Sequence, residues 1–546
     1  MNTVLSIRDL TVTLPRGGER SHAVKSLSLE VSQGEILCVV GESGSGKSLT
    51  SSAILGLLPE GVNVTGGEIL LQGQDLLSIS SEDLRKLRGS RIGMIFQEPM
   101  TALNPLRTIG DQIAEVFRAH TRLSISIIRK KTIELLESVH IPDPEKAARA
   151  YPHELSGGQR QRAMIAMALA LEPVLLIADE PTTALDVTTQ AQILRLIKDL
   201  QQRRGTAVLF ITHDFGVVAE IADKVVVMQR GELVESGTAT EVLNQPVHPY
   251  SRTLIAAVPS LKPSNISRLN RVSASQPILE LKGVSKTYQR MGLFKNNHRV
   301  THAVKDVSLS LSPGTTLGIV GESGSGKSTL ARIILGLIEP DEGSVSVEGA
   351  PKNARTRAER QQRARLVQMV FQDPYGSLNP RRKVGDIVAQ GPVAHGVSCS
   401  DAWKRAQRLF DLVGLDADAV HRYPHEFSGG QRQRIGLARA LALEPSVLLA
   451  DEPVSALDVS VQAQVLDLLQ QLKDELGLSM LFITHDLRVA AQVSDRVAVM
   501  KEGQIVEEAA VGDLFRVPVH SYTKALLAAV PGRDWAPPEF LLRQAA

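Results

Sequence analysis

Two glycine-rich segments of this sequence have the spacing of a loop that binds phosphate groups. Glycines allow successive backbone N–H groups to wrap around phosphate oxygens, the lysine neutralises the β- and γ-phosphates, and the final hydroxyl binds Mg²⁺. The sequence therefore predicts two sites for a nucleoside triphosphate with its Mg²⁺ ion. Both segments fit the pattern G-x-x-x-x-G-K-[ST]: they are Gly41, Glu42, Ser43, Gly44, Ser45, Gly46, Lys47, Ser48 and Gly321, Glu322, Ser323, Gly324, Ser325, Gly326, Lys327, Ser328.

A pair of acidic residues follows an apolar run further along the chain, and this arrangement also occurs twice. The pairs are Asp179 with Glu180 and Asp451 with Glu452. Ligands of α/β sheets bind at the carboxyl ends of buried strands, where these acids are expected to lie. We expect the aspartates to hold Mg²⁺ and the glutamates to orient and deprotonate an attacking water. An isolated acidic pair after a strand is more often a turn or a helix cap, so this assignment depends on the phosphate loops upstream.

A third repeated segment predicts a second anion site in each half. A Ser-Gly-Gly entry to a helix offers free backbone N–H groups and the positive end of the helix dipole. An ordinary capped helix start would explain a single copy equally well. The two segments are Ser156, Gly157, Gly158, Gln159 and Ser428, Gly429, Gly430, Gln431.

The elements that must position these residues can be predicted from hydrophobic pattern. Short apolar runs such as 35–40, 174–178 and 208–211 indicate buried strands. Residues 191–200 are apolar on one side and are followed by Gly205, which indicates an amphipathic helix and its end. Strand and helix alternate in each half, with a helical section in the middle. The sequence therefore predicts an α/β fold with a largely parallel core sheet.

The motifs recur because the 546-residue chain is a tandem duplication. The second and third motifs return at a common interval of 272 residues, which is far longer than a solenoid repeat. A polar stretch rich in proline and serine separates the halves. We therefore expect one nucleotide-binding domain with a C-terminal tail at 1–262, a linker at 263–276 and a second such domain at 277–546.

Composition excludes several other classes of protein. The net charge of +2 is too balanced to favour nucleic acid as a partner. Two cysteines, Cys38 and Cys399, are too few for a disulfide framework, and we expect neither a zinc site nor an iron–sulfur cluster. Cys38 lies in an apolar run and is expected to be buried in a strand. No secretory signal and no membrane-spanning segment is apparent, which predicts a cytoplasmic protein.

Taken in order, these motifs resemble those of the ABC ATPase family, and the resemblance covers essentially the whole chain. It implies two tandem P-loop nucleotide-binding domains, each with a RecA-like core, a helical subdomain and a short tail. It also implies that the domains pack head to tail, so that the segment beginning at Ser428 completes the site at Lys47 and the segment beginning at Ser156 completes the site at Lys327. Each site would hydrolyse ATP with Mg²⁺.

The resemblance assigns further roles residue by residue. It implies that Leu49 and Thr329 also bind ATP, that Gln97 and Gln372 are Q-loop residues that sense Mg²⁺ and touch a permease, and that His213 and His485 contact the γ-phosphate. Residues 184–186 and 456–458 match the D-loop. Tyr288 fits the aromatic residue that stacks on adenine, but Leu14 stands at the aligned position of the first half. The resemblance thus implies that the first site lacks that stacking, although both sites retain every residue needed for hydrolysis.

A segment after each domain indicates which transporter is involved. It reads Pro-Val-His-Pro-Tyr at 246–250 and Pro-Val-His-Ser-Tyr at 518–522, which on physical grounds predicts only a turn and a small helix. It resembles the tail of ATPases from bacterial oligopeptide, dipeptide and nickel importers, and the fused form resembles Yej-type ATPases of peptide (microcin C-like) importers. The implied partners are two integral membrane permease subunits and an extracytoplasmic substrate-binding protein. The implied location is the cytoplasmic face of the bacterial inner membrane.

Other functions are compatible with two tandem ATPase domains. Ribosome-associated translation factors of this class have a long charged helical linker, and related DNA-repair ATPases have zinc-binding cysteines; neither feature is present in this sequence. Sugar importers usually have a degraded second phosphate loop, whereas residues 321–328 are intact. An exporter ATPase, or an importer ATPase for nickel or glutathione, stays open as an alternative.

Overall fold

The computed structural model describes residues 2–15, 17, 20–183, 185–262, 276–290, 299–348, 356–373, 375–455 and 457–541. The predicted linker lies outside these residues, except for Gln276. The D-loop residues Ala184 and Ala456 also lie outside them. The chain forms two compact units. Unit 1 consists of Met1–Leu185, Thr189–Val258 and Pro531–Ala546, and unit 2 consists of Asp186–Thr188 and Pro259–Val530.

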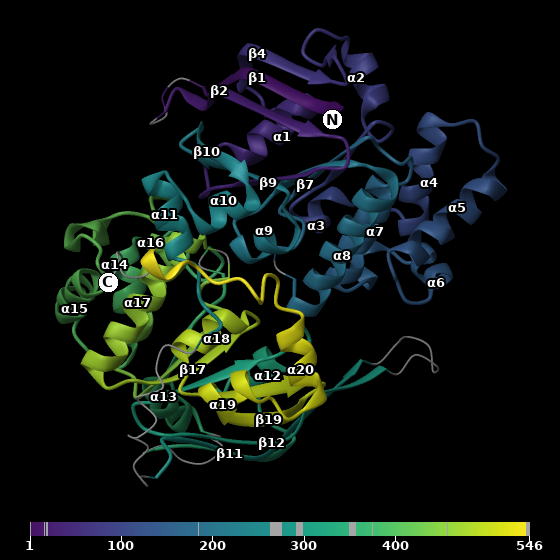
Figure 1. Cartoon of the computed structure of the whole chain (residues 1–546). Helices are drawn as coiled ribbons and strands as arrows, with labels where there is room; N and C mark the ends of the chain where they lie inside the picture. Colours follow the sequence, from purple (N-terminus) through teal and green to yellow (C-terminus); the bar gives the residue numbers. More distant parts are fainter. Residues whose placement is uncertain are drawn as a thin grey trace. The chain divides into compact units, whose positions relative to one another are not determined.

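An antiparallel sheet forms one layer of unit 1 and is drawn in purple in Figure 1. Its strands lie in the order β2-β1-β4-β5. Alternate residues of β2 are buried, as expected for a sheet with one solvated face. The buried side chains join a hydrophobic core with the parallel sheet beneath. The strand bounds are β1 Thr3–Thr13, β2 His22–Ser32, β4 Asn63–Leu71 and β5 Gln74–Asp75.

The second sheet of unit 1 positions the predicted chemistry. Its order is β10-β9-β3-β8-β7-β6, and all neighbouring strands are parallel except β9 and β10. Every residue of β3, β7 and β8 is buried, which explains their unbroken apolar sequences. The strand bounds are β3 Ile36–Val40, β6 Ile92–Ile95, β7 Leu175–Asp179, β8 Ala207–Ile211, β9 Lys224–Gln229 and β10 Glu232–Thr238.

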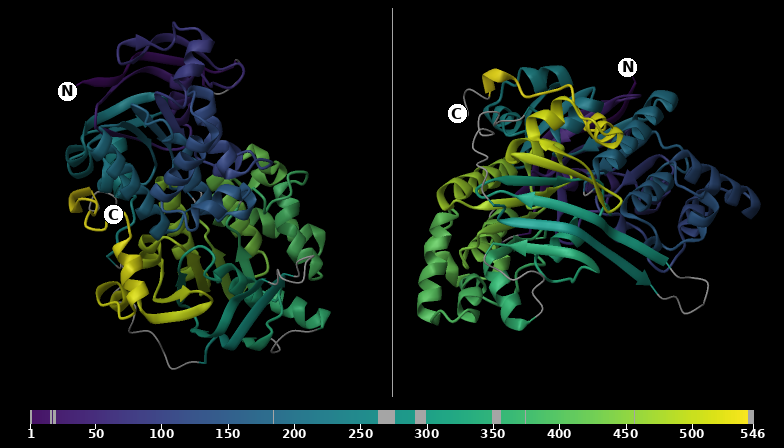
Figure 2. Two further views of the ribbon diagram at one scale, coloured as in Figure 1. Left: turned by 90° about the vertical axis from the view of Figure 1, so that its right-hand side faces the viewer. Right: turned by 90° about the horizontal axis from the view of Figure 1, so that it is seen from below.

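The helices of unit 1 fall into two groups. The group α4 to α7 forms the predicted helical section, and Figures 1 and 2 show α4, α5 and α6 standing away from the sheets. The other helices accompany the sheets. The bounds are α1 Lys47–Leu55, α2 Ser81–Leu87, α3 Pro99–Ala102, α4 Ile109–His120, α5 Ile125–Ser138, α6 Pro144–Arg149, α7 Gly157–Ala168, α8 Val187–Arg204, α9 Phe215–Ile221, α10 Ala239–Asn244 and α11 Pro249–Ala256.

Unit 2 repeats this architecture with its own strands. Its antiparallel layer has the order β12-β11-β14, and its main sheet has the order β15-β16-β17-β13-β18-β19, which matches the strand order of unit 1. Only the β18–β19 pair of the main sheet is antiparallel. The bounds are β11 Leu279–Arg290, β12 Arg299–Leu311, β13 Thr316–Val320, β14 Glu342–Val347, β15 Val367–Val370, β16 Val447–Asp451, β17 Ser479–Thr484, β18 Arg496–Lys501 and β19 Gln504–Ala510.

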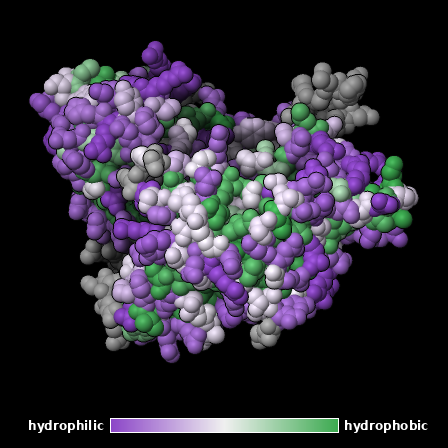
Figure 3. Space-filling model, turned by 90° about the horizontal axis from the view of Figure 1, so that it is seen from above, coloured by the Kyte–Doolittle hydropathy of each residue, from purple (hydrophilic) through white to green (hydrophobic). Residues whose placement is uncertain are grey.

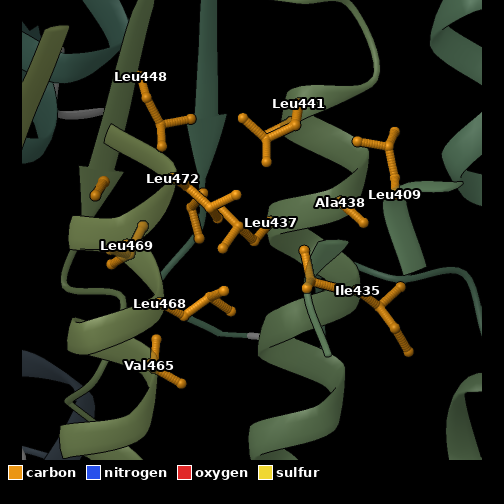
Figure 4. Close-up of a cluster of buried hydrophobic side chains, with 14 of the residues drawn as sticks. Leu409, Ile435, Leu437, Ala438, Leu441, Leu448, Val465, Leu468, Leu469 and Leu472 are labelled. Atoms are coloured by element: carbon orange, nitrogen blue, oxygen red, sulfur yellow. The ribbon is translucent and has the colours of Figure 1, made fainter. Parts of the chain in front are cut away.

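A large core of unit 2 lies between its helical section and the main sheet. Figure 4 shows Leu437 of α16 and Leu472 of α17 meeting between the two helices, with Leu448 of β16 beside them. The helix bounds are α12 Lys327–Ile334, α13 Arg357–Leu366, α14 Val384–Ala394, α15 Cys399–Leu412, α16 Gly429–Leu441, α17 Val459–Leu476, α18 Leu487–Val493, α19 Val511–Arg516 and α20 Ser521–Ala528. The predicted α/β class with mostly parallel core sheets is confirmed in both units.

On the face drawn in Figure 3, hydrophobic residues are interspersed among hydrophilic ones. Within the described residues, every helix is too short or too polar to traverse a membrane. Cys38 is buried in β3, as predicted, and Cys399 is exposed.

Candidate active sites

The first predicted phosphate loop connects β3 to α1 in unit 1. Gly41 and Gly46 have φ values of 151° and 104°. A Cβ atom at Gly41 would lie 2.2 Å from the Met228 carbonyl oxygen, and one at Gly46 would lie 2.6 Å from that of Ala23. Neighbouring backbone therefore leaves no room for a side chain at either position. The loop is held tightly enough for its amides to face a ligand.

The side chain of each loop lysine forms hydrogen bonds with the backbone of its own loop. The Lys47 ammonium donates to the carbonyl oxygens of Gly41 at 2.7 Å and Glu42 at 2.9 Å. Lys327 makes the same two contacts, each at 2.8 Å, with Gly321 and Glu322. Burial lowers the pKa of Lys327 although nearby carboxylates oppose the shift. Both ammonium groups thus lie against their own loops, where the motif predicts the lysine.

The aspartates end the buried strands beside these loops. Asp179 is the last residue of β7, and the Ser48 hydroxyl donates to its carboxylate at 3.1 Å. Burial raises the pKa of Asp179 to about 6, against the Ser48 hydrogen bond. Burial likewise raises the pKa of Asp451 to about 6, and Ser328 interacts with that carboxylate. The structure therefore brings together the hydroxyl and the carboxylate predicted to bind Mg²⁺ in each unit.

Each predicted catalytic glutamate is held by the predicted glutamine and histidine. Gln97 Nε2 donates to Glu180 at 2.9 Å, and His213 Nδ1 lies 3.3 Å from the same carboxylate. Burial would raise the pKa of Glu180, but His213, Thr183 and the charge of Lys47 outweigh it and lower the pKa to about 2. Glu180 is therefore ionised at neutral pH and able to accept a proton.

The second unit repeats this arrangement. Gln372 Nε2 donates to Glu452 at 2.8 Å, and His485 Nδ1 lies 3.1 Å from it. Burial would raise the pKa of Glu452, but the hydrogen bond and charge of His485 lower it. Burial would lower the pKa of His485, and Glu452 outweighs it and raises that pKa. Glu180 and Glu452 also share an unusual backbone, with φ values of 46° and 47° that turn the chain sharply after the strand.

The Ser-Gly-Gly segments begin helices, as predicted. Ser156 caps α7: its hydroxyl accepts from the Gln159 amide at 3.3 Å, and the Gln159 side chain accepts from the Ser156 amide at 3.0 Å. Ser428 and Gln431 form the same capping box at α16. The glutamine side chains are thus engaged within the helix start. The pairing of each segment with the phosphate loop of the other half stays a prediction.

The two halves differ at the position where the resemblance predicts an adenine-stacking residue. Tyr288 lies on β11 with 41% of its surface exposed, as a stacking residue requires. Leu14 follows β1 and packs against the core of unit 1. The strand registers support the alignment, because Thr13 pairs with His22 in unit 1 and Thr287 pairs with His302 in unit 2. The first half thus presents an aliphatic side chain at the equivalent position.

Three residues near the sites were not predicted. The Thr183 hydroxyl donates to Glu180 at 3.0 Å. The Tyr250 and Tyr522 hydroxyls accept hydrogen bonds from the backbone of the two phosphate loops. The repetition of the tail segment at 246–250 and 518–522 was the signal that could have pointed to the tyrosines.

The residues fit a bound Mg²⁺ ion. Serine hydroxyl, carboxylate and amide oxygens are ligands that Mg²⁺ accepts. The pKa of Asp179 and of Asp451 is raised because burial outweighs the nearby positive charges, so further positive charge would stabilise each carboxylate. A cation beside Ser48 or Ser328 would supply that charge.

Comparisons with known proteins agree with this geometry. The family described as ABC transporter matches residues 24–183 and 304–455, and the oligopeptide/dipeptide transporter C-terminal region matches residues 234–289 and 506–537. The glutathione import ATP-binding protein GsiA of Salmonella choleraesuis is 47% identical over 97% of this chain and 90% of its own length. The peptidoglycan transport ATP-binding protein YejF of Agrobacterium fabrum is 47% identical over 96% of each chain.

Solved structures also resemble this chain. A dimeric ATP-binding cassette in a post-hydrolysis state with ADP and Pi is 32% identical, with a TM-score of 0.39, and covers 43% of this chain and 98% of its own. The family matches extend over more than half of the chain, and the relatives match nearly all of it. The chain therefore belongs to the ABC transporter family and is an ATPase with two ATP-binding cassettes.

Proposed function

We propose that this ATPase powers the import of peptides or peptide-like compounds through a membrane permease. The observation that carries the proposal is the oligopeptide/dipeptide transporter region that follows both cassettes. The names of the relatives, which refer to glutathione import and to peptidoglycan transport, support the same class of substrate. Glutathione is the second candidate substrate, because the GsiA relatives are as similar to this chain as YejF.

The proposed ATP sites use the residues that the structure gathers in each unit. The phosphate loop and its lysine bind the triphosphate, and Ser48 with Asp179, or Ser328 with Asp451, would hold Mg²⁺ with Gln97 or Gln372 nearby. The ion would neutralise phosphate charge during hydrolysis. Glu180 and Glu452 accept the proton of the attacking water, and their low pKa values keep them ionised for that step.

The proposed coupling follows from binding one ATP to two surfaces. The phosphate loop of one cassette and the Ser-Gly-Gly helix start of the other contact the same nucleotide, so two ATP molecules hold the cassettes together. Hydrolysis removes the bridging γ-phosphate and allows them to separate. This two-state motion transmits energy to the permease.

We place the permease contact of the first cassette beside Gln97. A pocket there is lined by Ser52, Leu55, Leu57, Met94, Phe96, Gln97, Glu98, Thr101 and Asp179. Leu57 and Phe96 are 47% and 37% exposed, which gives a membrane protein an apolar surface to bind. The proposed complex contains two permease subunits and an extracytoplasmic substrate-binding protein, with the ATPase on the cytoplasmic face of the inner membrane.

The test is ATP-dependent uptake of a tripeptide by vesicles that contain the chain and the membrane proteins that copurify with it. We expect accumulation with the wild type and none with the Glu180→Gln, Glu452→Gln double variant. That variant should lose ATP turnover by about 100-fold or more and remain in a closed, ATP-bound form.

Three outcomes discriminate among the alternatives. Undiminished turnover in the double variant would contradict the assigned base. Uptake of glutathione but not of tripeptides with ordinary peptide bonds would favour the second candidate. Co-sedimentation with ribosomes, without membrane proteins, would support a translation factor instead.

A further inference from the structure

The tail segment of each cassette forms a turn that is built by its histidine. The Nδ1 atom of His248 accepts from the Tyr250 amide at 3.2 Å and caps the start of α11. His520 caps α20 in the same way, with its Nδ1 atom 3.1 Å from the Tyr522 amide. The conformation of the turn therefore fixes where each tyrosine ring points.

A glutamate on the neighbouring strand holds the same turn from the other side. The Glu235 carboxylate of β10 accepts from the amides of Val247 at 2.7 Å and His248 at 3.1 Å. In unit 2 the Glu507 carboxylate of β19 accepts from the amides of Val519 at 2.7 Å and His520 at 2.9 Å. Hydrogen bonds thus attach each tail to the edge strand of its main sheet, at the residues that precede the tyrosine.

The tyrosine hydroxyl of each tail reaches the phosphate loop. The Glu42 amide donates to the Tyr250 hydroxyl oxygen at 3.1 Å. The Glu322 amide donates to that of Tyr522 at 3.2 Å. Glu42 and Glu322 are the second residues of the two loops, immediately after the glycines that leave β3 and β13.

One peptide group of each loop is consequently held at both ends. In the peptide that joins Gly41 to Glu42, the carbonyl oxygen accepts from Lys47 at 2.7 Å and the N–H group donates to Tyr250. The peptide that joins Gly321 to Glu322 has the same two partners, Lys327 at 2.8 Å and Tyr522. A rotation of this peptide would break both contacts.

Simple core packing does not account for the position of the hydroxyl groups. The tails differ next to the tyrosine, with Pro249 in one and Ser521 in the other, yet the hydroxyl contact is the same. Burial raises the pKa of Tyr522 above its usual range, with a further contribution from the Glu322 carboxylate. Its hydroxyl stays protonated, so no phenolate forms beside the loop.

We propose that Tyr250 and Tyr522 are positioning residues that fix the first peptide of each phosphate loop and so make the transporter-specific tail part of the ATP site. The inference rests on the assignment of the two loops as ATP sites. Under this proposal the tail contributes to the structure of the ATP site, so a change in the tail would alter the affinity for nucleotide.

The test uses the full chain with Tyr250→Phe and Tyr522→Phe, separately and together. Phenylalanine keeps the ring and removes only the hydroxyl. We expect the double variant to bind ATP and ADP about three- to tenfold more weakly, as loss of one hydrogen bond would give. Turnover at saturating ATP should fall less than the affinity does, because the variants leave the catalytic glutamates in place. Each single variant should weaken one of the two binding events.

Ser251→Ala is the matched control. Ser251 follows Tyr250 in α11, is fully buried, and its hydroxyl has no hydrogen-bond partner among the described residues. This variant should leave nucleotide affinity unchanged. Unaltered affinity in the double tyrosine variant, or an equal loss in Ser251→Ala, would overturn the proposal. Normal ATP binding by Lys47→Ala with Lys327→Ala would instead show that the site assignment is wrong, whatever the tyrosine variants do.

Discussion

The pKa values of two adjacent carboxyl groups at the end of β7 are shifted in opposite directions. Burial raises the pKa of Asp179 to about 6, whereas at Glu180 the contacts with His213, Thr183 and Lys47 overcome burial and lower it to about 2. Environment, and not residue type, sets this difference. Asp179 is suited to receive a cation, and Glu180 is suited to remain an anion that accepts a proton.

The two glycines of the second Ser-Gly-Gly segment differ in the space that they leave for a side chain, so substitutions can distinguish an effect on stability from an effect on activity. A Cβ atom at Gly430 would lie 2.3 Å from Cγ1 of Val461, whereas at Gly429 the nearest atom is 3.8 Å away, on Leu457. We expect Gly430→Ala to lower the free energy of unfolding by about 1–2 kcal/mol, measured by chemical denaturation. Gly429→Ala should change it by less than about 0.5 kcal/mol and still reduce ATP turnover, because the methyl group is added to the helix start that we propose binds phosphate. Equal stability losses in both variants would contradict this distinction.

Motif residues could be predicted because each chemical role needs one residue type at a fixed spacing. Lys47, Asp179 and Glu180 are therefore found from the sequence. The repetition of the tail segment marks Tyr250 but not its role, since it contacts a loop residue 208 positions earlier and any large side chain would satisfy the local pattern. Its role becomes visible only when the fold brings the tail to the loop.

At the scale of elements, predicted types are right and several bounds are wrong. The helix α1 begins at Lys47 directly after the first phosphate loop, although its first turn is polar and shows no hydrophobic periodicity. The helix predicted at 191–200 extends over Val187–Arg204 and ends before Gly205, whose φ is 63°. The first core strand was expected from Glu35 but begins at Ile36, since the Glu35 amide bonds the Ser32 carbonyl in a turn.

Glu35 joins that turn to β9, which gives unit 1 a pH-dependent contact. Its carboxylate accepts from the Ser32 amide at 2.7 Å and lies 2.7 Å from the Lys224 ammonium. Burial would raise the pKa of Glu35, but Lys224 and Ser32 lower it below 4.5. Because the folded-state pKa is depressed, the stabilisation is present above the unfolded value and is lost as pH falls through the folded value.

We therefore expect Glu35→Gln to lower the free energy of unfolding by about 1 kcal/mol at neutral pH. The difference from the wild type should shrink as the pH falls below 4.5. Thermal unfolding followed from neutral to acidic pH measures this difference. The control is Glu68→Gln, since Glu68 forms an exposed pair with Arg8 at 3.9 Å. A pH-independent difference for Glu35→Gln would refute the contribution of its charge.

Because the chain is duplicated, a phosphate loop has two Ser-Gly-Gly segments with which it could form an ATP site, one in each half. We predict that the site at Lys47 uses Ser428 and that the site at Lys327 uses Ser156. In a chain carrying Lys327→Ala, which retains only the first site, Ser428→Asp should weaken ATP binding by about tenfold or more because it places a carboxylate against phosphate. Aspartate is also a good helix cap, so α16 should stay folded.

Ser156→Asp in the same Lys327→Ala chain is the matched control. It should leave ATP affinity at the remaining site within about twofold, as measured by nucleotide titration. If Ser156→Asp weakened ATP binding and Ser428→Asp did not, each phosphate loop would use the Ser-Gly-Gly segment of its own half, and the prediction would be wrong.

The repeat does not reveal that the end of the chain belongs to unit 1. The Gly532 amide donates to Glu220 at 3.3 Å, Trp535 Nε1 donates to Asn244 at 3.2 Å, and Leu541 is buried. Unit 1 is thus assembled from segments that lie on both sides of unit 2 in the sequence. If the gene were divided at the linker, the first product would lack residues Pro531–Ala546, which belong to unit 1, and the second product would carry them instead. Separate expression of the halves would therefore need this segment joined to the first half.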